Sequence, residues 1–176
     1  MKKIEIRISG LGGQGVVLAG QVLARAAVYD RKNAVLTQSY GAEARGSTAK
    51  SEIIISDGKI GFPIVRKCDV LVAMSQEAAE KNITDLKEDG ILLVDSSNVK
   101  KVPETKAQTF KIPATETAEK VFEAKIYANM IMLGALTNIT KIANVESFIV
   151  AIKETVTKQI LDANLSAYKK GLSLTV

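Results

Sequence analysis

The residues Ile4-Glu5-Ile6-Arg7-Ile8-Ser9-Gly10-Leu11-Gly12-Gly13-Gln14-Gly15-Val16 decide the fold class of this chain. Isoleucine alternates with polar residues at the start, which predicts a strand, and the apolar segment 16–28 after the glycines predicts a helix. Glycines 10, 12 and 15 have the G-x-G-x-x-G spacing, in which backbone amides approach a phosphate at the start of a helix. The stretch therefore indicates a Rossmann-like strand–turn–helix unit and a seat for a nucleotide or coenzyme.

The usual fingerprint of an NAD site is incomplete. That fingerprint needs an acidic residue about 20 residues further on, at the end of the second strand, to hold the ribose. The second strand is predicted at 34–37, and it ends in Gln38-Ser39-Tyr40 without a carboxylate, while Asp30 is assigned to the turn after the helix. A glycine-rich turn that only packs a helix tightly against a sheet remains an alternative.

The rest of the chain alternates between strand and helix patterns. Strands are predicted at 51–56, 70–73, 91–94 and 107–110, and Asp57-Gly58 is a turn signal. Helices are predicted at 75–86 with Ser75 as N-cap, at 126–136, at 145–156 and in a last segment to about residue 170. We expect an α/β fold: one doubly wound, Rossmann-like domain over residues 1–176, with a mostly parallel sheet and a helical C-terminal part. The apolar first helix is expected to lie between the sheet and a further covering layer, such as another subunit.

Composition excludes several classes of function. The chain has no histidine and one cysteine, so it cannot build a His-based catalytic centre, a disulfide framework or a four-cysteine iron–sulfur site. Cys68 precedes an apolar strand and is expected to be buried there, and no metal site is predicted. With 5% aromatic residues and a net charge of +5 spread over the chain, nucleic-acid binding is not expected. No apolar run is long enough to cross a membrane and no secretory signal is evident, so a cytoplasmic protein is expected.

A second candidate loop follows the second predicted strand: Gln38-Ser39-Tyr40-Gly41-Ala42-Glu43-Ala44-Arg45-Gly46-Ser47-Thr48. Doubly wound folds place ligand-contacting loops at such positions. Arg45 can grip a phosphate or carboxylate through two parallel hydrogen bonds, and Gly46 lets the backbone come close to it. Glu43 can orient Arg45 or contact a neighbouring chain. A polar surface loop with a local Glu–Arg pair is the simpler alternative.

These two loops, together with Asn129-Met130-Ile131-Met132-Leu133-Gly134-Ala135, strongly resemble the gamma subunit of the 2-oxoacid:ferredoxin oxidoreductases. The resemblance spans nearly the whole chain. It implies a complex that oxidatively decarboxylates a 2-oxoacid, joins the acyl group to coenzyme A (CoA) and reduces ferredoxin. Thiamine diphosphate and iron–sulfur clusters would then lie on partner subunits of the alpha, beta and delta types. The resemblance is greatest to the 2-oxoglutarate type, with pyruvate, branched-chain 2-oxoacids and indolepyruvate as alternatives.

The resemblance implies that the chain contributes no catalytic residue and is inactive alone. It also implies that the chain helps to form the CoA site at the contact with its partners. The isolated chain could also form a homodimer. Two other functions remain open: a free-standing NADP-binding oxidoreductase with Arg45 on the 2′-phosphate, and a non-enzymatic assembly subunit. The candidate binding residues are Gly10, Gly12, Gly13, Gln14, Gly15, Ser39, Tyr40, Gly41, Glu43, Arg45, Gly46, Ser47 and Asn129.

Overall fold

The structure is a computed structural model that describes residues 3–41 and 47–174. Its strands are β1 (Lys3–Leu11), β2 (Asn33–Tyr40), β3 (Thr48–Ser56), β4 (Cys68–Ala73), β5 (Leu86–Asp95) and β6 (Gln108–Ile112). Its α-helices are α1 (Val16–Tyr29), α2 (Gln76–Asn82), α3 (Ala114–Phe122), α4 (Ala128–Thr140), α5 (Val145–Thr155) and α6 (Leu161–Ser173). Short 3-10 helices lie at Ile83–Asp85, Lys125–Tyr127 and Lys158–Ile160.

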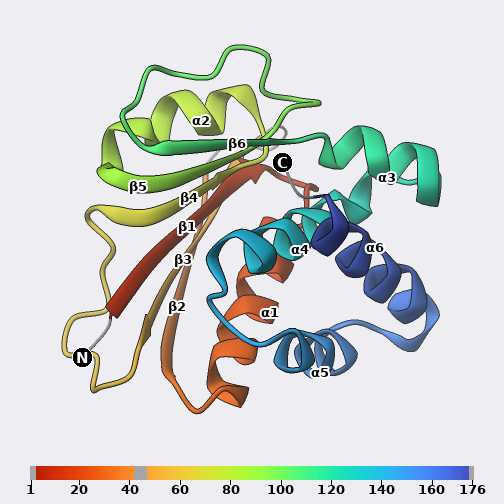
Figure 1. The fold of residues 1–176 in the computed structure, drawn as a ribbon, viewed down its shortest axis with the longest axis horizontal. Helices are drawn as coiled ribbons and strands as arrows, with labels where there is room; N and C mark the ends of the chain where they lie inside the picture. The colour runs from red at the N-terminus through yellow and green to blue at the C-terminus, as the bar shows by residue number, and fades with distance from the viewer. Residues whose placement is uncertain (1–2, 42–46, 175–176) are drawn as a thin grey trace.

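The six strands form one sheet in the order β2-β3-β1-β4-β5-β6 (Figure 1). β1, β4, β5 and β6 are parallel neighbours, whereas β3 runs antiparallel to both β1 and β2. The seven-residue connection from β2 to β3 is too short for a parallel crossover, which takes about a dozen residues or more, so these two strands pair as a hairpin. The expected mostly parallel α/β sheet is confirmed, with this hairpin as an insertion.

Helices cover both faces of the sheet, as the continuous apolar runs predicted (Figure 1). Along β4, Val70 and Val72 belong to the core shared with α1 and α4, while Leu71 and Ala73 belong to the core under α2. The predicted helix 75–86 is too long: Ser75 caps α2 through Ala78 N at 3.1 Å, but the helix ends at Asn82, and Leu86 already begins β5. No helix in the described part of the chain is long and apolar enough to span a bilayer.

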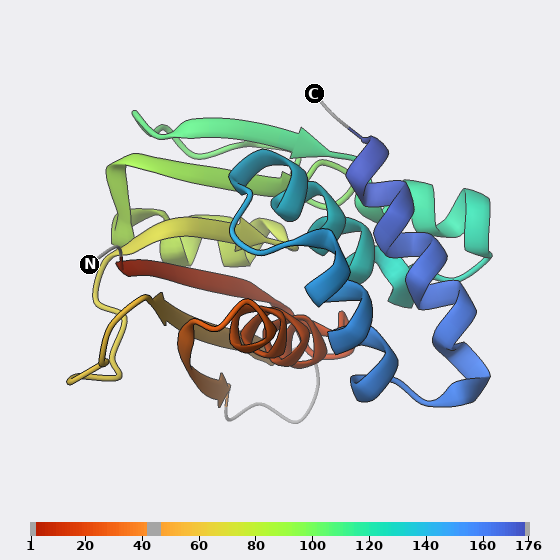
Figure 2. The ribbon, with the colours of Figure 1, turned by 60° about the horizontal axis from the view of Figure 1, so that its bottom comes forward.

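The layer that covers α1 on the side away from the sheet comes from the same chain. α5 packs along α1 (Figure 2). Asp30 follows α1, and its carboxylate accepts hydrogen bonds from the Asn144 backbone N–H at 2.6 Å and from the Ser147 hydroxyl at the start of α5. Burial alone would raise the pKa of Asp30, but these hydrogen bonds favour the ionised form, and the net effect is a lowered pKa.

The last third of the chain packs by close contact of helix backbones. A Cβ at Gly134 of α4 would lie 2.1 Å from the Tyr168 carbonyl oxygen, and a Cβ at Gly171 of α6 would lie 2.0 Å from the Ile131 carbonyl oxygen. Neither distance is possible for a real side chain, so glycine at both positions is required for the α4–α6 contact. This contact holds α4, and with it Asn129, against the start of α1.

Candidate functional site

The glycine turn between β1 and α1 is held open by hydrogen bonds at its base. Gly12 N–H donates to the Ser47 carbonyl at 2.8 Å, and Gln14 N–H donates to the Leu11 carbonyl at 3.1 Å. Gly13 and Gly15 have φ of +89° and +72°, a region that side chains disfavour. Gly15 is the N-cap of α1, and the first turn of this helix carries no acidic residue. The positive end of the helix dipole is therefore available for an anion.

Asn129 braces this turn from behind. Its side chain, 1% exposed, donates from Nδ2 to the Gly15 carbonyl at 3.2 Å. A Cβ at Gly15 would lie 2.1 Å from the same nitrogen atom, so no larger residue fits at position 15 while Asn129 occupies this place. Asn129 therefore braces the turn and does not line the pocket that opens at Gln14.

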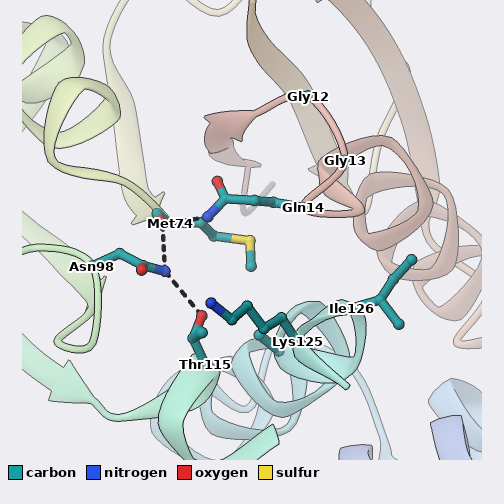
Figure 3. A pocket seen from close by; sticks show the side chains of 9 residues that line it. Gly12, Gly13, Gln14, Met74, Asn98, Thr115, Lys125 and Ile126 are labelled. Carbon is teal, nitrogen blue, oxygen red and sulfur yellow. Dashed lines mark hydrogen bonds between the residues drawn. The ribbon is translucent and has the colours of Figure 1, made fainter. Parts of the chain in front are cut away.

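Gln14 joins the carboxyl ends of two strands. Its Oε1 accepts from Leu11 N–H at 2.7 Å and its Nε2 donates to the Met74 carbonyl at 2.9 Å (Figure 3). Gln14 lies where the chain direction divides: β1 leads into α1 on one face of the sheet, and β4 leads into α2 on the other. Open α/β sheets bind ligands at such a switch point.

A pocket of about 280 Å³ opens at this point (Figure 3). It is lined by Gly12, Gly13, Gln14, Met74, Asn98, Thr115, Lys125, Ile126 and Ala128. Lys125 extends from the wall opposite the glycine turn towards Thr115, and its Nζ also pairs with Glu119 at 3.2 Å. The pocket thus has the glycine turn that precedes α1 on one wall and a lysine cation on the other.

A buried carboxylate organises the floor beside the pocket. Asp95, at the end of β5, is fully buried and accepts from the Thr115 hydroxyl at 2.5 Å and from Asn98 Nδ2 at 2.9 Å. Asn98 Nδ2 also lies 3.3 Å from the Met74 carbonyl oxygen, to which Gln14 donates. These bonds connect the carboxyl ends of β1, β4 and β5 with the segment after β6.

Sequence reasoning missed this second wall. Asp95, Asn98, Thr115 and Lys125 were not among the candidate residues. One signal was present for Asp95, because it directly follows the apolar run 91–94 and so stands at the carboxyl end of a predicted parallel strand, where ligand sites gather. Lys125 follows a separate helix and had no such signal.

The predicted site residues fall into four groups. Gly12, Gly13 and Gln14 line the pocket, whereas Gly10, Gly15 and Asn129 support the turn without lining it. Ser39 and Tyr40 are exposed at the end of β2, Gly41 N–H donates to the Thr48 carbonyl at 2.8 Å, and Ser47 holds Gly12. Glu43, Arg45 and Gly46 lie outside the described residues. The two predicted loops therefore meet at their bases.

The described residues do not provide a metal centre: among them, no three His, Cys, Asp or Glu side chains come together to hold an ion. Cys68 is buried at the start of β4, and burial raises the pKa of its thiol to about 11. The expectation of a structural cysteine agrees with this position.

Comparison with known proteins defines the class to which this fold and site belong. Residues 5–174 match the model of the pyruvate ferredoxin/flavodoxin oxidoreductase family, and the chain belongs to that family. Subunit KorC of the 2-oxoglutarate synthase of Methanocaldococcus jannaschii is 51% identical over 95% of this chain and 91% of its own length. Subunit PorC of the pyruvate synthase of the same organism is 34% identical over 93% of this chain and 92% of its own.

Two solved structures are similar as well. The gamma subunit of the keto/oxoacid ferredoxin oxidoreductase of Geobacter sulfurreducens is 44% identical, with a TM-score of 0.85 over 96% of this chain and 95% of that one. The 2-oxoglutarate:ferredoxin oxidoreductase of Magnetococcus marinus, with 2-oxoglutarate, CoA and succinyl-CoA bound, has a TM-score of 0.88 over 99% of this chain but 31% of that one. At 24% identity the latter supports the fold alone. The predicted gamma subunit of an oxoacid:ferredoxin oxidoreductase complex is confirmed.

Proposed function

We propose that this chain forms one wall of the CoA site in a 2-oxoglutarate:ferredoxin oxidoreductase. The complex would convert 2-oxoglutarate, CoA and oxidised ferredoxin into succinyl-CoA, carbon dioxide and reduced ferredoxin. The identity of 51% with a 2-oxoglutarate synthase subunit, against 34% with a pyruvate synthase subunit, supports this substrate. The observation that carries the CoA site is the pocket at the switch point, between the glycine turn and Lys125.

The pocket suits part of a CoA molecule. The positive end of the α1 dipole behind the glycine turn and the Lys125 ammonium both favour a phosphate group, and the turn lets that group come close to the backbone. Its volume of about 280 Å³ lies just below the range of roughly 300–1,000 Å³ usual for pockets that enclose a drug-sized ligand, and CoA is larger than such ligands. We therefore place the rest of the coenzyme on partner chains.

In the Magnetococcus protein the same fold is part of a longer chain. The region that matches this chain makes up 31% of the Magnetococcus chain, so it is covalently joined there to a larger remainder. In the complex proposed here, separate subunits of the alpha, beta and delta types take the place of that remainder. They would carry the thiamine diphosphate, which supplies the carbanion chemistry, and the iron–sulfur clusters that pass electrons to ferredoxin. One buried cysteine and no histidine fit a chain that holds neither cofactor.

Within this assembly the chain's own residues position the coenzyme. The backbone of the turn and Lys125 would hold phosphate, and the Asp95–Asn98–Thr115 network would keep the pocket floor rigid, so that the CoA thiol meets the acyl group in a fixed orientation. Arg45 remains a predicted phosphate contact from its sequence position. Replacing it with alanine should raise the apparent KM for CoA, and an unchanged KM would remove Arg45 from the proposal.

The test of the CoA wall is Gly12→Val in the complex assembled from all its subunits. A Cβ at Gly12 meets only Ser47, with its nearest contact at 3.5 Å, so the fold accepts it, while the larger side chain would stand at the pocket wall. We expect a complete complex with a raised KM for CoA. Loss of the complex on gel filtration would instead favour the assembly-subunit alternative. Saturable NADPH binding by the isolated chain would favour the NADP alternative.

A further inference from the structure

The β2 strand forms one border of the sheet. Within the described residues β2 pairs with β3 only, so every second residue directs its backbone N–H and C=O away from the sheet. Thr37, Gln38, Ser39 and Tyr40 are exposed, and Tyr40 keeps 64% of its surface. Figure 2 shows this border at the lower side of the sheet, with α1 beside it.

This border lacks the features by which proteins prevent strand pairing. Edge strands are usually short, bulged, or marked by charges or proline. β2 is eight residues long, its sequence Asn-Ala-Val-Leu-Thr-Gln-Ser-Tyr contains neither a charge nor a proline, and its register with β3 is unbroken. The opposite border shows the contrast, because β6 has five residues and includes the exposed Lys111.

An apolar hollow lies next to the unprotected edge. It measures about 260 Å³ and is lined by Ala24, Arg25, Val28, Tyr29, Ala34 and Leu36. Val28 is 56% exposed and Tyr29 41% exposed, both at the end of α1. Arg25 is the one charged lining residue, and it already pairs with Glu154 at 3.4 Å. The strand edge and the hollow together form one nearly uncharged surface.

We propose that this surface binds a second copy of the chain, with β2 pairing antiparallel to β2 of the copy about a two-fold axis perpendicular to the sheet. Such an axis keeps both α1 helices on the same face of the joined sheet. The two hollows then adjoin, and Val28 of each copy covers the hollow of the other copy. A register centred on Thr37, opposite Thr37 of the copy, keeps paired side chains on the same face of the joined sheet and places no like charges opposite each other, because β2 has none. An uncharged edge offers no attraction to a charged partner, but it is complementary to itself.

The test is the mass of the purified full-length chain by sedimentation equilibrium, with matched variants. Gln38→Lys and Val28→Lys together place four positive charges near the two-fold axis and should convert the dimer to a monomer. The control pair is Gln108→Lys and Val121→Lys: Gln108 is the exposed glutamine on β6, and Val121 is a 53% exposed helical valine away from this surface. The control protein should remain a dimer.

A disulfide cross-link between the two copies tests the proposed β2 register independently. Thr37→Cys should form a disulfide-linked dimer on mild oxidation, whereas Thr109→Cys on β6 should not, and the buried Cys68 keeps the background low. A monomeric wild-type chain at high concentration would overturn the proposal, as would a dimer unaffected by the β2 variant. If the wild-type chain is a monomer and the β2 variant fails to join the other subunits, the edge binds a partner strand instead of a second copy.

Discussion

Replacing Gly15 with alanine should destabilise the fold in two ways, through the backbone conformation and through a steric clash. The φ of +72° at this position costs a non-glycine residue about 1–2 kcal/mol. The new Cβ would also lie 2.1 Å from Asn129 Nδ2, and overpacking of this kind costs about 1–3 kcal/mol. Gly13→Ala is the control, since its φ is +89° but nothing lies within 4 Å of its Cβ. We expect Gly15→Ala to lower the free energy of unfolding by about 2–5 kcal/mol and Gly13→Ala by about 1–2 kcal/mol.

The double variant Gly15→Ala/Asn129→Ala identifies the clash. Truncating Asn129 removes the Nδ2 and Cγ atoms and leaves its Cβ 3.4 Å from the new methyl group, an ordinary contact. The cost of Gly15→Ala in that background should therefore fall to the backbone share, a coupling of about 1–3 kcal/mol. Urea unfolding measures it, and thermal midpoints should shift by about 2–4 °C per kcal/mol for a chain of this size. Equal costs in both backgrounds would refute the brace.

Three further predictions concern other parts of the fold. Gly134→Ala puts a Cβ 2.1 Å from the Tyr168 carbonyl oxygen; we expect it to destabilise the chain by about 3 kcal/mol or more in urea, and a cost below about 1 kcal/mol would contradict the α4–α6 contact. Hydrogen bonds from Ser147 and Asn144 lower the pKa of Asp30 in the folded state. The stability that the ionised Asp30 contributes is therefore complete above the unfolded pKa of about 3.9 and is lost as pH falls through the folded value. The stability gap between wild type and Asp30→Asn should therefore narrow below about pH 4, and a gap that widens in acid would reverse the assigned sign. Cys68, with its pKa raised to about 11, should react with a thiol reagent at pH 8 only after unfolding, and rapid reaction of the native chain would contradict its burial.

The sequence predicted the sheet and its two covered faces well because each depends on local pattern. The continuous runs 70–73 and 91–94 indicate strands that are covered on both faces, as β4 and β5 are. The alternation in 4–9 indicates a strand with one covered face, whereas β1 is buried on both, with Arg7 and Ser9 only 3% and 2% exposed. The hairpin of β2 and β3 was less evident, because the short connection at 41–47 reads equally well as a ligand loop. The boundary of α2 was misjudged because residues 83–86 are compatible with both a helix and the start of β5.

The site could be predicted on one side only. The glycine turn has a sequence signature, so Gly12, Gly13 and Gln14 were found. The inward orientation of Gln14 was not, because its partner Met74 lies 60 residues away and is reached through a backbone carbonyl that no motif marks. Lys125 and Thr115 enter the pocket only through the placement of α3 and the turn after it, which depends on tertiary packing.

The measurement that tests the central claim most directly is the apparent KM for CoA of the assembled enzyme with Lys125→Ala. Lys120→Ala is the matched control, because both lysine side chains are 71% exposed and both pair with a glutamate, but Lys120 does not line the pocket. We predict that Lys125→Ala raises the KM about fivefold, as expected for an exposed ion pair worth about 1 kcal/mol, and leaves decarboxylation of 2-oxoglutarate in the absence of CoA unchanged. Equal KM values for the two variants would contradict a CoA wall at this pocket.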